Sequence, residues 1–248
     1  MLADHITISI VSHGQGQLVH ELLRDLARYC IGQVEVILTL NLPEELPFVP
    51  QEFGYVTQIV RNSTPKGFGE NYNAAFRLVN TEYFCILNPD VRIRDNLFPH
   101  LIAGLRDPQA GIVGPLICNP DGITEDSARR FPTPIYILQK AFTTFPPPEY
   151  VVGKSPLRVD WLGGMFVMLR SDTFKMINGF DERYFLYYED VDLCWRLRAK
   201  GRSAFLVPAA IAVHDARRQS HRNLYYLAWH LSSMLRFFGK RTWAMLWH

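Results

Sequence analysis

The order of the first three elements is the feature that most constrains the fold. Residues 5–12 (HITISIVS) are rich in β-branched side chains, as in a buried strand, and run into a His-Gly turn. Residues 18–30 carry leucines at helical spacing, and residues 34–40 (VEVILTL) form a second apolar strand. A strand, a helix and a strand in this order predict one α/β domain in which helices flank a mostly parallel sheet.

The chain as a whole limits the class of protein. Its 248 residues are enough for one domain with a substantial core. The formal net charge of +2, without a long Lys/Arg run, gives no reason to expect a nucleic-acid partner. The 4 cysteines include no Cys-x-x-Cys pair, which predicts reduced core residues. No signal peptide and no membrane-spanning stretch is apparent, so we expect a cytoplasmic protein.

Two features near the start suit a phosphate-bearing ligand. Ligands of a parallel sheet bind at the carboxyl ends of its strands, where Ser12, His13 and Asn41 stand. After a third strand at residues 56–61, two glycines open a helix, where free backbone N–H groups suit an anion. A Gly-x-Gly is by itself more often an ordinary turn. The residues of this loop that we single out are Gly67, Phe68, Gly69 and Asn73.

Candidate metal ligands follow two later strands. The strand at residues 83–87 ends in Asn88-Pro89-Asp90, and oxygen ligands at such an edge suit Mg²⁺ or Mn²⁺ held against phosphates. The alternative is a plain Asn-Pro-Asp turn. His214 follows another apolar run; such a histidine is more often structural, although its ring is a competent Mn²⁺ ligand.

Residues 123–156 are the least regular part of the chain, because prolines interrupt every long element. An insertion of this length in a compact domain is usually disordered or functional. Arg129 and Arg130 lie inside it, and they either clamp a diphosphate or are simply solvated. Beyond it, a predicted strand at residues 159–169 contains two adjacent glycines, which indicates a close approach to its backbone.

Apolar side chains at helical spacing predict a helix that begins near Glu189 and ends at Gly201. Acidic residues are common at a helix N-terminus because the helix dipole favours them there. Asp190, however, lies four residues before Cys194 and therefore points inward, behind an aromatic run. Asp192 is explained by a salt bridge to Arg196, four residues on.

These motifs resemble a known family. NGFD at residues 178–181 and YEDVDLC at residues 188–194 resemble the acceptor-side motif of inverting family 2 glycosyltransferases of the GT-A fold. The likeness is strongest to the bacterial rhamnosyltransferases that build O-antigen and related cell-surface polysaccharides. It implies a Rossmann-like GT-A domain over residues 1–222, followed by a helical tail over residues 223–248.

The resemblance also implies roles for individual residues. Asp190 corresponds to the general base, and Asp90 and His214 to the metal ligands. Asn88 stands where the family's metal motif has its first Asp, and Asn41 stands near the place of the Asp that binds the nucleotide base. The glycine loop corresponds to the donor-binding loop. The residues that it places near the acceptor or the phosphates are Asp160, Trp161, Gly164, Glu189, Arg129, Arg130, Arg217 and Arg218.

The implied reaction moves L-rhamnose from dTDP-L-rhamnose onto a hydroxyl of a lipid-diphosphate-linked saccharide, with inversion and with a divalent cation, Mg²⁺ or Mn²⁺. A UDP-sugar donor is an alternative. So is a catalytically inactive nucleotide-binding or scaffold protein, which the departures at Asn41 and Asn88 support.

The tail repeats apolar residues from Leu224 to Phe238 at the spacing of an amphipathic helix. It either packs on the sheet alone, which would leave the residues beyond Phe238 idle, or it also contacts an anionic membrane. We favour contact with the cytoplasmic face of the inner membrane, because Trp243 and Trp247 would otherwise face water and the family's acceptors are commonly lipid-linked.

Overall fold

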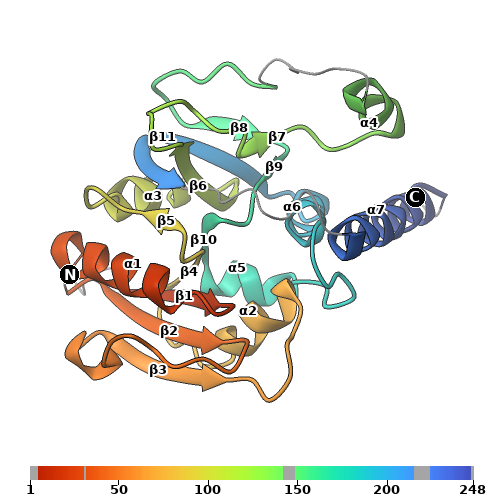
Figure 1. Ribbon diagram of the computed structural model, residues 1–248. Helices are drawn as coiled ribbons and strands as arrows, with labels where there is room; N and C mark the ends of the chain where they lie inside the picture. The colour runs from red at the N-terminus through yellow and green to blue at the C-terminus, as the bar shows by residue number, and fades with distance from the viewer. Residues whose placement is uncertain (1–4, 31, 142–148, 215–223, 247–248) are drawn as a thin grey trace.

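A 9-stranded sheet runs through the middle of the molecule (Figure 1). The computed structural model describes residues 5–30, 32–141, 149–214 and 224–246. The strand order is β3-β2-β1-β4-β10-β6-β11-β5, with β8 beside β11. The strands are β1 (Ile6–Ser12), β2 (Val34–Leu40), β3 (Val56–Arg61), β4 (Tyr83–Leu87), β5 (Val91–Arg92), β6 (Ala110–Cys118), β8 (Leu157–Val159), β10 (Phe166–Arg170) and β11 (Ser203–His214).

The sheet is mostly parallel, as the sequence predicts. β1, β2, β3 and β4 pair in parallel, and β6 pairs in parallel with β11. β10 runs antiparallel to both of its neighbours, β4 and β6, and therefore joins the two parallel groups without reversing either. β5 and β8 run antiparallel to β11 at the far edge. The carboxyl ends of all the parallel strands thus meet on one side of the molecule.

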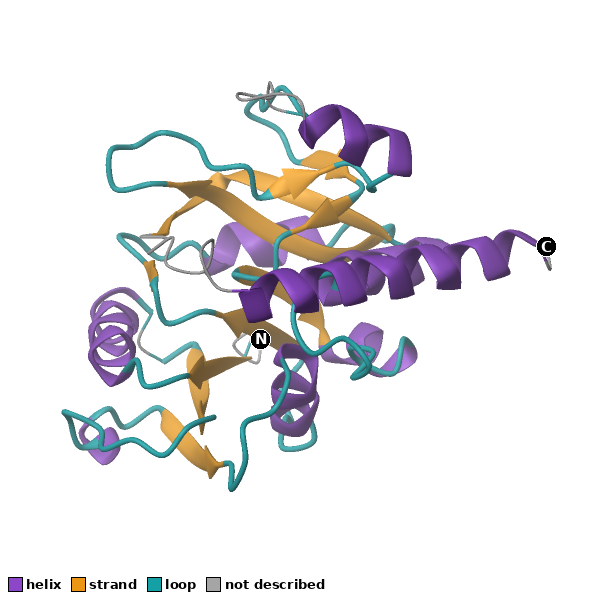
Figure 2. Cartoon of the chain, turned by 45° about the vertical axis from the view of Figure 1, so that its right-hand side comes forward, coloured by secondary structure: helices purple, strands orange, loops and turns teal. Residues whose placement is uncertain are grey.

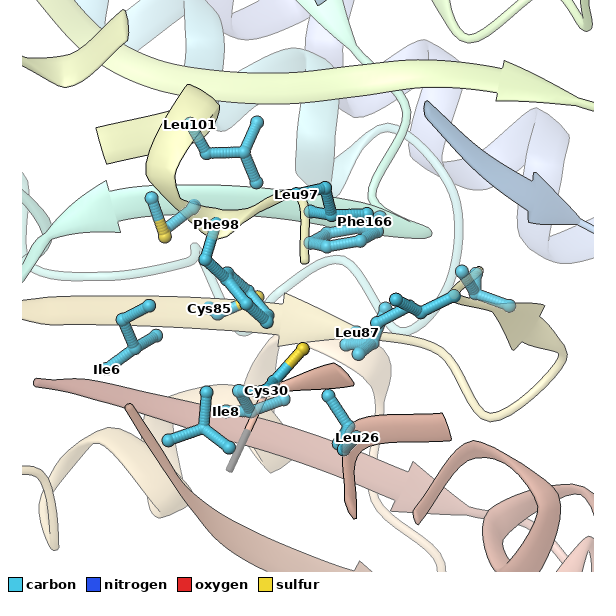
Figure 3. Close-up of a cluster of buried hydrophobic side chains, with 14 of the residues drawn as sticks. Ile6, Ile8, Leu26, Cys30, Cys85, Leu87, Leu97, Phe98, Leu101 and Phe166 are labelled. Carbon is cyan, nitrogen blue, oxygen red and sulfur yellow. The ribbon is translucent and has the colours of Figure 1, made fainter. Parts of the chain in front are cut away.

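Helices cover both faces of the sheet. They are α1 (Gly16–Tyr29), α2 (Phe68–Phe76), α3 (Phe98–Leu105), α4 (Pro134–Ala141), α5 (Ser171–Met176), α6 (Glu189–Ala199) and α7 (Leu224–Leu246), with a short 3-10 helix at Pro50–Glu52. On one face, α1 and α3 pack Leu26, Phe98 and Leu101 onto Ile8 and Cys85 of the sheet (Figure 3). On the other face, α2, α5 and α6 form a second core with part of α7. The 4 cysteines are free and buried, as predicted.

One predicted strand is wrong in its extent. Residues 159–169 form the end of β8, the short strand β9 (Trp161–Leu162) and most of β10 rather than one strand. β9 leaves the main sheet and pairs with β7 (Ala128–Arg129) in a two-stranded ribbon. Gly163 and Gly164 make the break, and the N–H of Gly163 donates to the carbonyl of Ser127 at 2.8 Å. The irregular insertion therefore contains β7 and α4, and β7 pairs with β9 directly before the two glycines.

α7 packs against the segment that leads into α6, and its far end reaches beyond the body of the domain (Figures 1 and 2). Phe237 is 1% exposed, and the hydroxyl of Ser233 donates to the carbonyl of Leu186 at 2.9 Å. The ammonium of Lys240 lies 2.5 Å from a carboxylate oxygen of Asp192, which is fully buried. The expectation that a packed helix leaves everything beyond Phe238 idle is therefore wrong. No helix in the described part of the chain is long and apolar enough to span a membrane.

Candidate active site

A sharp backbone turn aims two carboxyl groups at one cavity. Tyr187 and Tyr188 both adopt the left-handed conformation, with φ of 68° and 65°. This conformation costs a non-glycine residue on the order of 1 kcal/mol or more, and such strain gathers at functional sites. α6 begins directly after the turn, so that Glu189 and Asp190 stand at its N-terminus and line the cavity.

Backbone hydrogen bonds fix the orientation of the Asp190 carboxylate. One oxygen accepts the N–H of Gly164 at 3.1 Å, and the other accepts the N–H of Val191 at 2.8 Å. Burial raises the pKa of Asp190, while these two bonds favour the charged form and limit the rise. The prediction that Asp190 points inward is confirmed, and the expected bridge between Asp192 and Arg196 is present at 2.6 Å.

Glu189 is the more deeply buried of the two acids. It is 5% exposed, and its Oε2 atom has no hydrogen-bond partner among the described residues. Burial, and then the neighbouring charge of Asp190, raise the pKa of Glu189 well above its ordinary value. The two backbone hydrogen bonds to Asp190 stabilise its carboxylate form, whereas Oε2 of Glu189 has no such donor among the described residues.

Asp90 and His214 meet across the edge of the sheet. β11 pairs with β5 so that His214 lies opposite Val91, and its Nε2 atom is 3.3 Å from Oδ2 of Asp90. Its Nδ1 atom is 2.9 Å from the carboxylate of Glu125, a residue that the sequence analysis missed. Burial alone would lower the pKa of His214, but the hydrogen bonds and charges of the two carboxylates raise it to about 9.

The Asp90–His214 pair fits a divalent cation. Oδ1 of Asp90 is buried and has no hydrogen-bond partner among the described residues, so it is free to take a ligand. A carboxylate held next to Nε2 of a histidine, with Nδ1 of the same ring held by a second carboxylate, is a common arrangement at metal sites. No group of three or more His, Cys, Asp or Glu within the described ranges could hold a metal by itself. A bound cation would take its further ligands from water or substrate oxygens.

Two consecutive residues, Gly164 and Met165, connect Asp190 to the segment that contains Asp90. The carbonyl of Met165 accepts the N–H of Asn88 at 2.8 Å, at the end of the strand that leads to Asp90. The preceding N–H, that of Gly164, donates to Asp190. The dipeptide Gly164-Met165 thus forms hydrogen bonds both to the end of β4 and to the start of α6.

The cavity beside Asp190 has a volume of about 490 Å³ and brings together most of the residues predicted to face the acceptor. Arg129 lies over the ring of Trp161, 5.3 Å from its centroid, and pairs with Asp126 at 2.9 Å. The indole N–H of Trp161 donates to the carbonyl of Arg130 at 2.9 Å. The residues that line it and were predicted from the sequence are Arg129, Arg130, Trp161, Gly164, Glu189 and Asp190.

Asp160 does not belong to this wall. One of its oxygens accepts the N–H of Phe131 at 2.9 Å, and the other binds Arg198 at 3.1 Å. The side chain therefore fastens the insertion to α6, and its expected contact with a substrate stays a prediction. Arg217 and Arg218 lie outside the described residues.

At the carboxyl ends of β1 and β2, two of the three predicted donor residues are structural. Ser12 is fully buried, and its hydroxyl accepts the N–H of Gln15 at 3.0 Å. Asn41 is 1% exposed and binds both the N–H and the carbonyl of Lys66, each at 2.9 Å. Both side chains hold loops, and their assignment to the nucleotide stays a prediction. His13 is exposed, 3.2 Å from the Asn41 amide.

The glycine loop is explained by packing. A Cβ atom at Gly67 would lie 2.8 Å from the carbonyl oxygen of Phe185, and one at Gly69 would lie 2.6 Å from Cβ of Phe180. The N–H of Phe68 already donates to Phe185 at 2.8 Å. These glycines therefore let α2 approach the motif that precedes α6, and the assignment of the loop to the donor stays a prediction.

Asn73 and Asn88 also contact the protein itself. The Asn73 amide binds both the N–H and the carbonyl of Phe180, each at 2.9 Å, which gives it a structural contact, while its role in binding the donor stays a prediction. Asn88 accepts the hydroxyl of the buried Tyr72 at 3.3 Å. Among the donor-side side chains, His13 is exposed, and Asp90 keeps one carboxylate oxygen without a hydrogen-bond partner in the described residues.

Comparison with known families gives the affiliation. A family model described as Glycosyltransferase like family 2 matches residues 3–236. The chain belongs to this family. The predicted resemblance is thereby confirmed, and the match includes both the sheet and most of α7.

Relatives of this family 2 member include two named rhamnosyltransferases. An N-acetylglucosaminyl-diphospho-decaprenol L-rhamnosyltransferase of Mycobacterium tuberculosis is 32% identical over 201 residues, which cover 76% of this chain and 64% of that protein. Rhamnosyltransferase WbbL of Escherichia coli K12 is 28% identical over 256 residues, which cover 95% of this chain and 93% of that protein. The chain thus spans about two thirds of the mycobacterial relative and nearly all of WbbL.

The fold is shared with a solved glycosyltransferase. The structure of GalNAc-T7 with UDP, GalNAc and Mn²⁺ superposes with a TM-score of 0.68 at 14% identity, covering 87% of this chain and 44% of that one. The predicted GT-A fold is therefore confirmed for this family 2 member.

Proposed function

We propose that this protein is an inverting glycosyltransferase that moves L-rhamnose from dTDP-L-rhamnose to a hydroxyl of a lipid-diphosphate-linked saccharide. The observation that carries the proposal is the placement of Asp190. Its oriented carboxylate opens into a cavity large enough for a sugar, and Gly164 and Met165 link it to the strand that leads to Asp90. The names of the two rhamnosyltransferase relatives support the sugar, and the mycobacterial name supports a lipid-diphosphate acceptor.

In the proposed reaction, Asp190 takes the proton from the acceptor hydroxyl as that oxygen attacks the anomeric carbon. The new bond forms on the face opposite the departing diphosphate, so the configuration inverts. The pKa of Glu189 is raised well above its ordinary value by burial, which favours its neutral form and leaves Asp190 as the better-stabilised carboxylate for this step. Asp90 and His214 would hold a divalent cation, which when bound neutralises charge on the leaving diphosphate.

Arg129 and Arg130 are the cationic residues of the cavity wall, and we assign them to the diphosphate of the acceptor. Guanidinium groups bind phosphate oxygens in a bidentate manner, which suits this assignment. Trp161 would pack against the saccharide, because its ring lies in the same wall.

A lipid-linked acceptor reaches the site from a membrane, and we propose that α7 rests on the cytoplasmic face of that membrane. Leu227, Leu231 and Leu235 recur every four residues on its outer face and are 55%, 45% and 68% exposed. Apolar side chains in a row on one helix face suit shallow insertion into a bilayer surface. The Trp243 side chain and Trp247, on which the sequence argument relied, lie outside the side chains that the structure describes.

The test is a transfer assay with matched donors. The purified protein is incubated with Mn²⁺, a synthetic N-acetylglucosaminyl-diphospho-lipid and either dTDP-L-rhamnose or a UDP-sugar, and the product is analysed by mass spectrometry and NMR. We expect transfer from dTDP-L-rhamnose with an inverted anomeric linkage. Transfer only from a UDP-sugar would refute the donor, and nucleotide binding without any transfer would favour the scaffold alternative.

A further inference from the structure

α7 contributes one side chain to the cavity that the sequence analysis did not assign. His230 lines the cavity together with Asp190. Its ring lies 5.3 Å from that of Tyr187 and 5.4 Å from that of Tyr188, both in edge-on contact. Neither ring nitrogen of His230 has a hydrogen-bond partner among the described residues, so both remain available to a ligand.

The contacts of α7 show why His230 faces this way. Ser233 and Phe237 follow it at three and seven residues, on the same side of the helix. Ser233 donates to the carbonyl of Leu186, and Phe237 packs on Tyr188 with ring centroids 5.7 Å apart. Lys240 continues this line to Asp192. These contacts hold one side of α7 against the turn before α6. His230 lies on that same side and therefore lines the cavity.

The chemistry of the cavity suits a saccharide. Rings of Trp161, Tyr187 and Tyr188 offer apolar faces, while Glu189 and Asp190 offer polar atoms. A pyranose presents the same combination of C–H faces and hydroxyl groups. A neutral imidazole both donates and accepts one hydrogen bond, which matches a hydroxyl or an acetamido group. Burial lowers the pKa of His230, which favours this neutral form near pH 7.

We propose that His230 is an acceptor-contacting residue, which binds a hydroxyl or acetamido group of the saccharide to be glycosylated and thereby gives α7 a part in acceptor selection. This inference rests on the proposed function. Asp190 acts on the attacking hydroxyl, and His230, on the facing element, holds a neighbouring group of the same sugar. A purely structural histidine would instead contribute to stability without affecting the acceptor.

The experiment compares His230→Ala and His230→Gln with wild type and with His100→Gln, an exposed histidine on α3 at the opposite face of the sheet. The KM for an N-acetylglucosaminyl-diphospho-lipid, the KM for dTDP-L-rhamnose and the Tm are measured for each. We expect His230→Ala to raise the acceptor KM by about tenfold, the scale of one lost hydrogen bond, with donor KM and Tm unchanged. His230→Gln should have an acceptor KM between those of His230→Ala and wild type, because its amide can still form a hydrogen bond. His100→Gln should have the acceptor KM of wild type.

Two results would overturn the inference. One is an unchanged acceptor KM in His230→Ala; the other is a parallel change of both KM values with a lowered Tm, which would mark a structural role. If wild type transfers no sugar, the proposed function fails separately. Calorimetric binding of the same N-acetylglucosaminyl-diphospho-lipid then decides on His230, because equal affinity of wild type and His230→Ala would refute the contact.

Discussion

Replacing Asp190 with Asn tests both the chemistry and the geometry of the site. The change removes the proton acceptor, and we expect turnover to fall by a factor on the order of a hundred or more. It also changes the hydrogen bonds. The carboxylate accepts two backbone N–H groups, from Gly164 and Val191, whereas a side-chain amide has only one oxygen to offer. One of the two N–H groups must therefore lose its partner.

An unpaired buried donor costs about 1–3 kcal/mol. For a chain of this length, each kcal/mol corresponds to about 2–4 °C in Tm, so Asp190→Asn should unfold a few degrees below wild type. Turnover is measured by the transfer assay, Tm by calorimetry, and dTDP binding by titration. Asp121→Asn, on an exposed turn, is the matched control. Wild-type turnover in a folded Asp190→Asn protein would exclude Asp190 as the base, and an unchanged Tm would refute the hydrogen-bond argument.

Three further predictions follow from the same contacts. Asp90→Ala should weaken Mn²⁺-dependent binding of dTDP in calorimetric titrations, and His214→Ala should do so to a smaller degree; unchanged affinity in both would remove the metal pair. Lys240→Ala should lower the free energy of unfolding by about 1–3 kcal/mol, because the buried Asp192 loses a cation 2.5 Å away; denaturant titration with no shift of the midpoint would contradict this. Leu231→Gln should reduce co-sedimentation with anionic vesicles, and a wild-type protein that fails to bind them at low salt would sink the membrane proposal.

Much of the fold was predictable because the strands are bounded clearly in the sequence. β2, β3 and β4 have the predicted limits, since each contains a cluster of β-branched or other apolar residues that polar or glycine-containing segments bound. The position of Asp190 followed from helical spacing alone. The orientation of a side chain on a helix could therefore be predicted from the sequence alone, because it depends only on the spacing of nearby residues.

The roles of other residues depend on contacts that no local pattern records. Glu125 reaches His214 across 89 positions of sequence, and His230 joins the cavity only because Ser233 and Phe237 fix the helix that carries it. Asn41 stands at a strand end, as predicted, but strand position does not say whether an amide faces a ligand or a loop. In each case the function of the side chain depends on which distant residue it contacts, and the local sequence does not show that.

The late position of α7 in the sequence has a consequence for biosynthesis. The sheet, the Asp90 carboxylate and α6 all lie upstream of it, and a domain generally folds as a unit, so α7 is the last element that this unit awaits during synthesis. When a nascent chain has left the ribosome only as far as α6, the carboxylate of Asp192 lacks its contact with Lys240. The ring of Tyr188 likewise lacks its contact with Phe237. We therefore expect the acceptor side of the site to mature last, so that a partly synthesised chain cannot yet position a sugar.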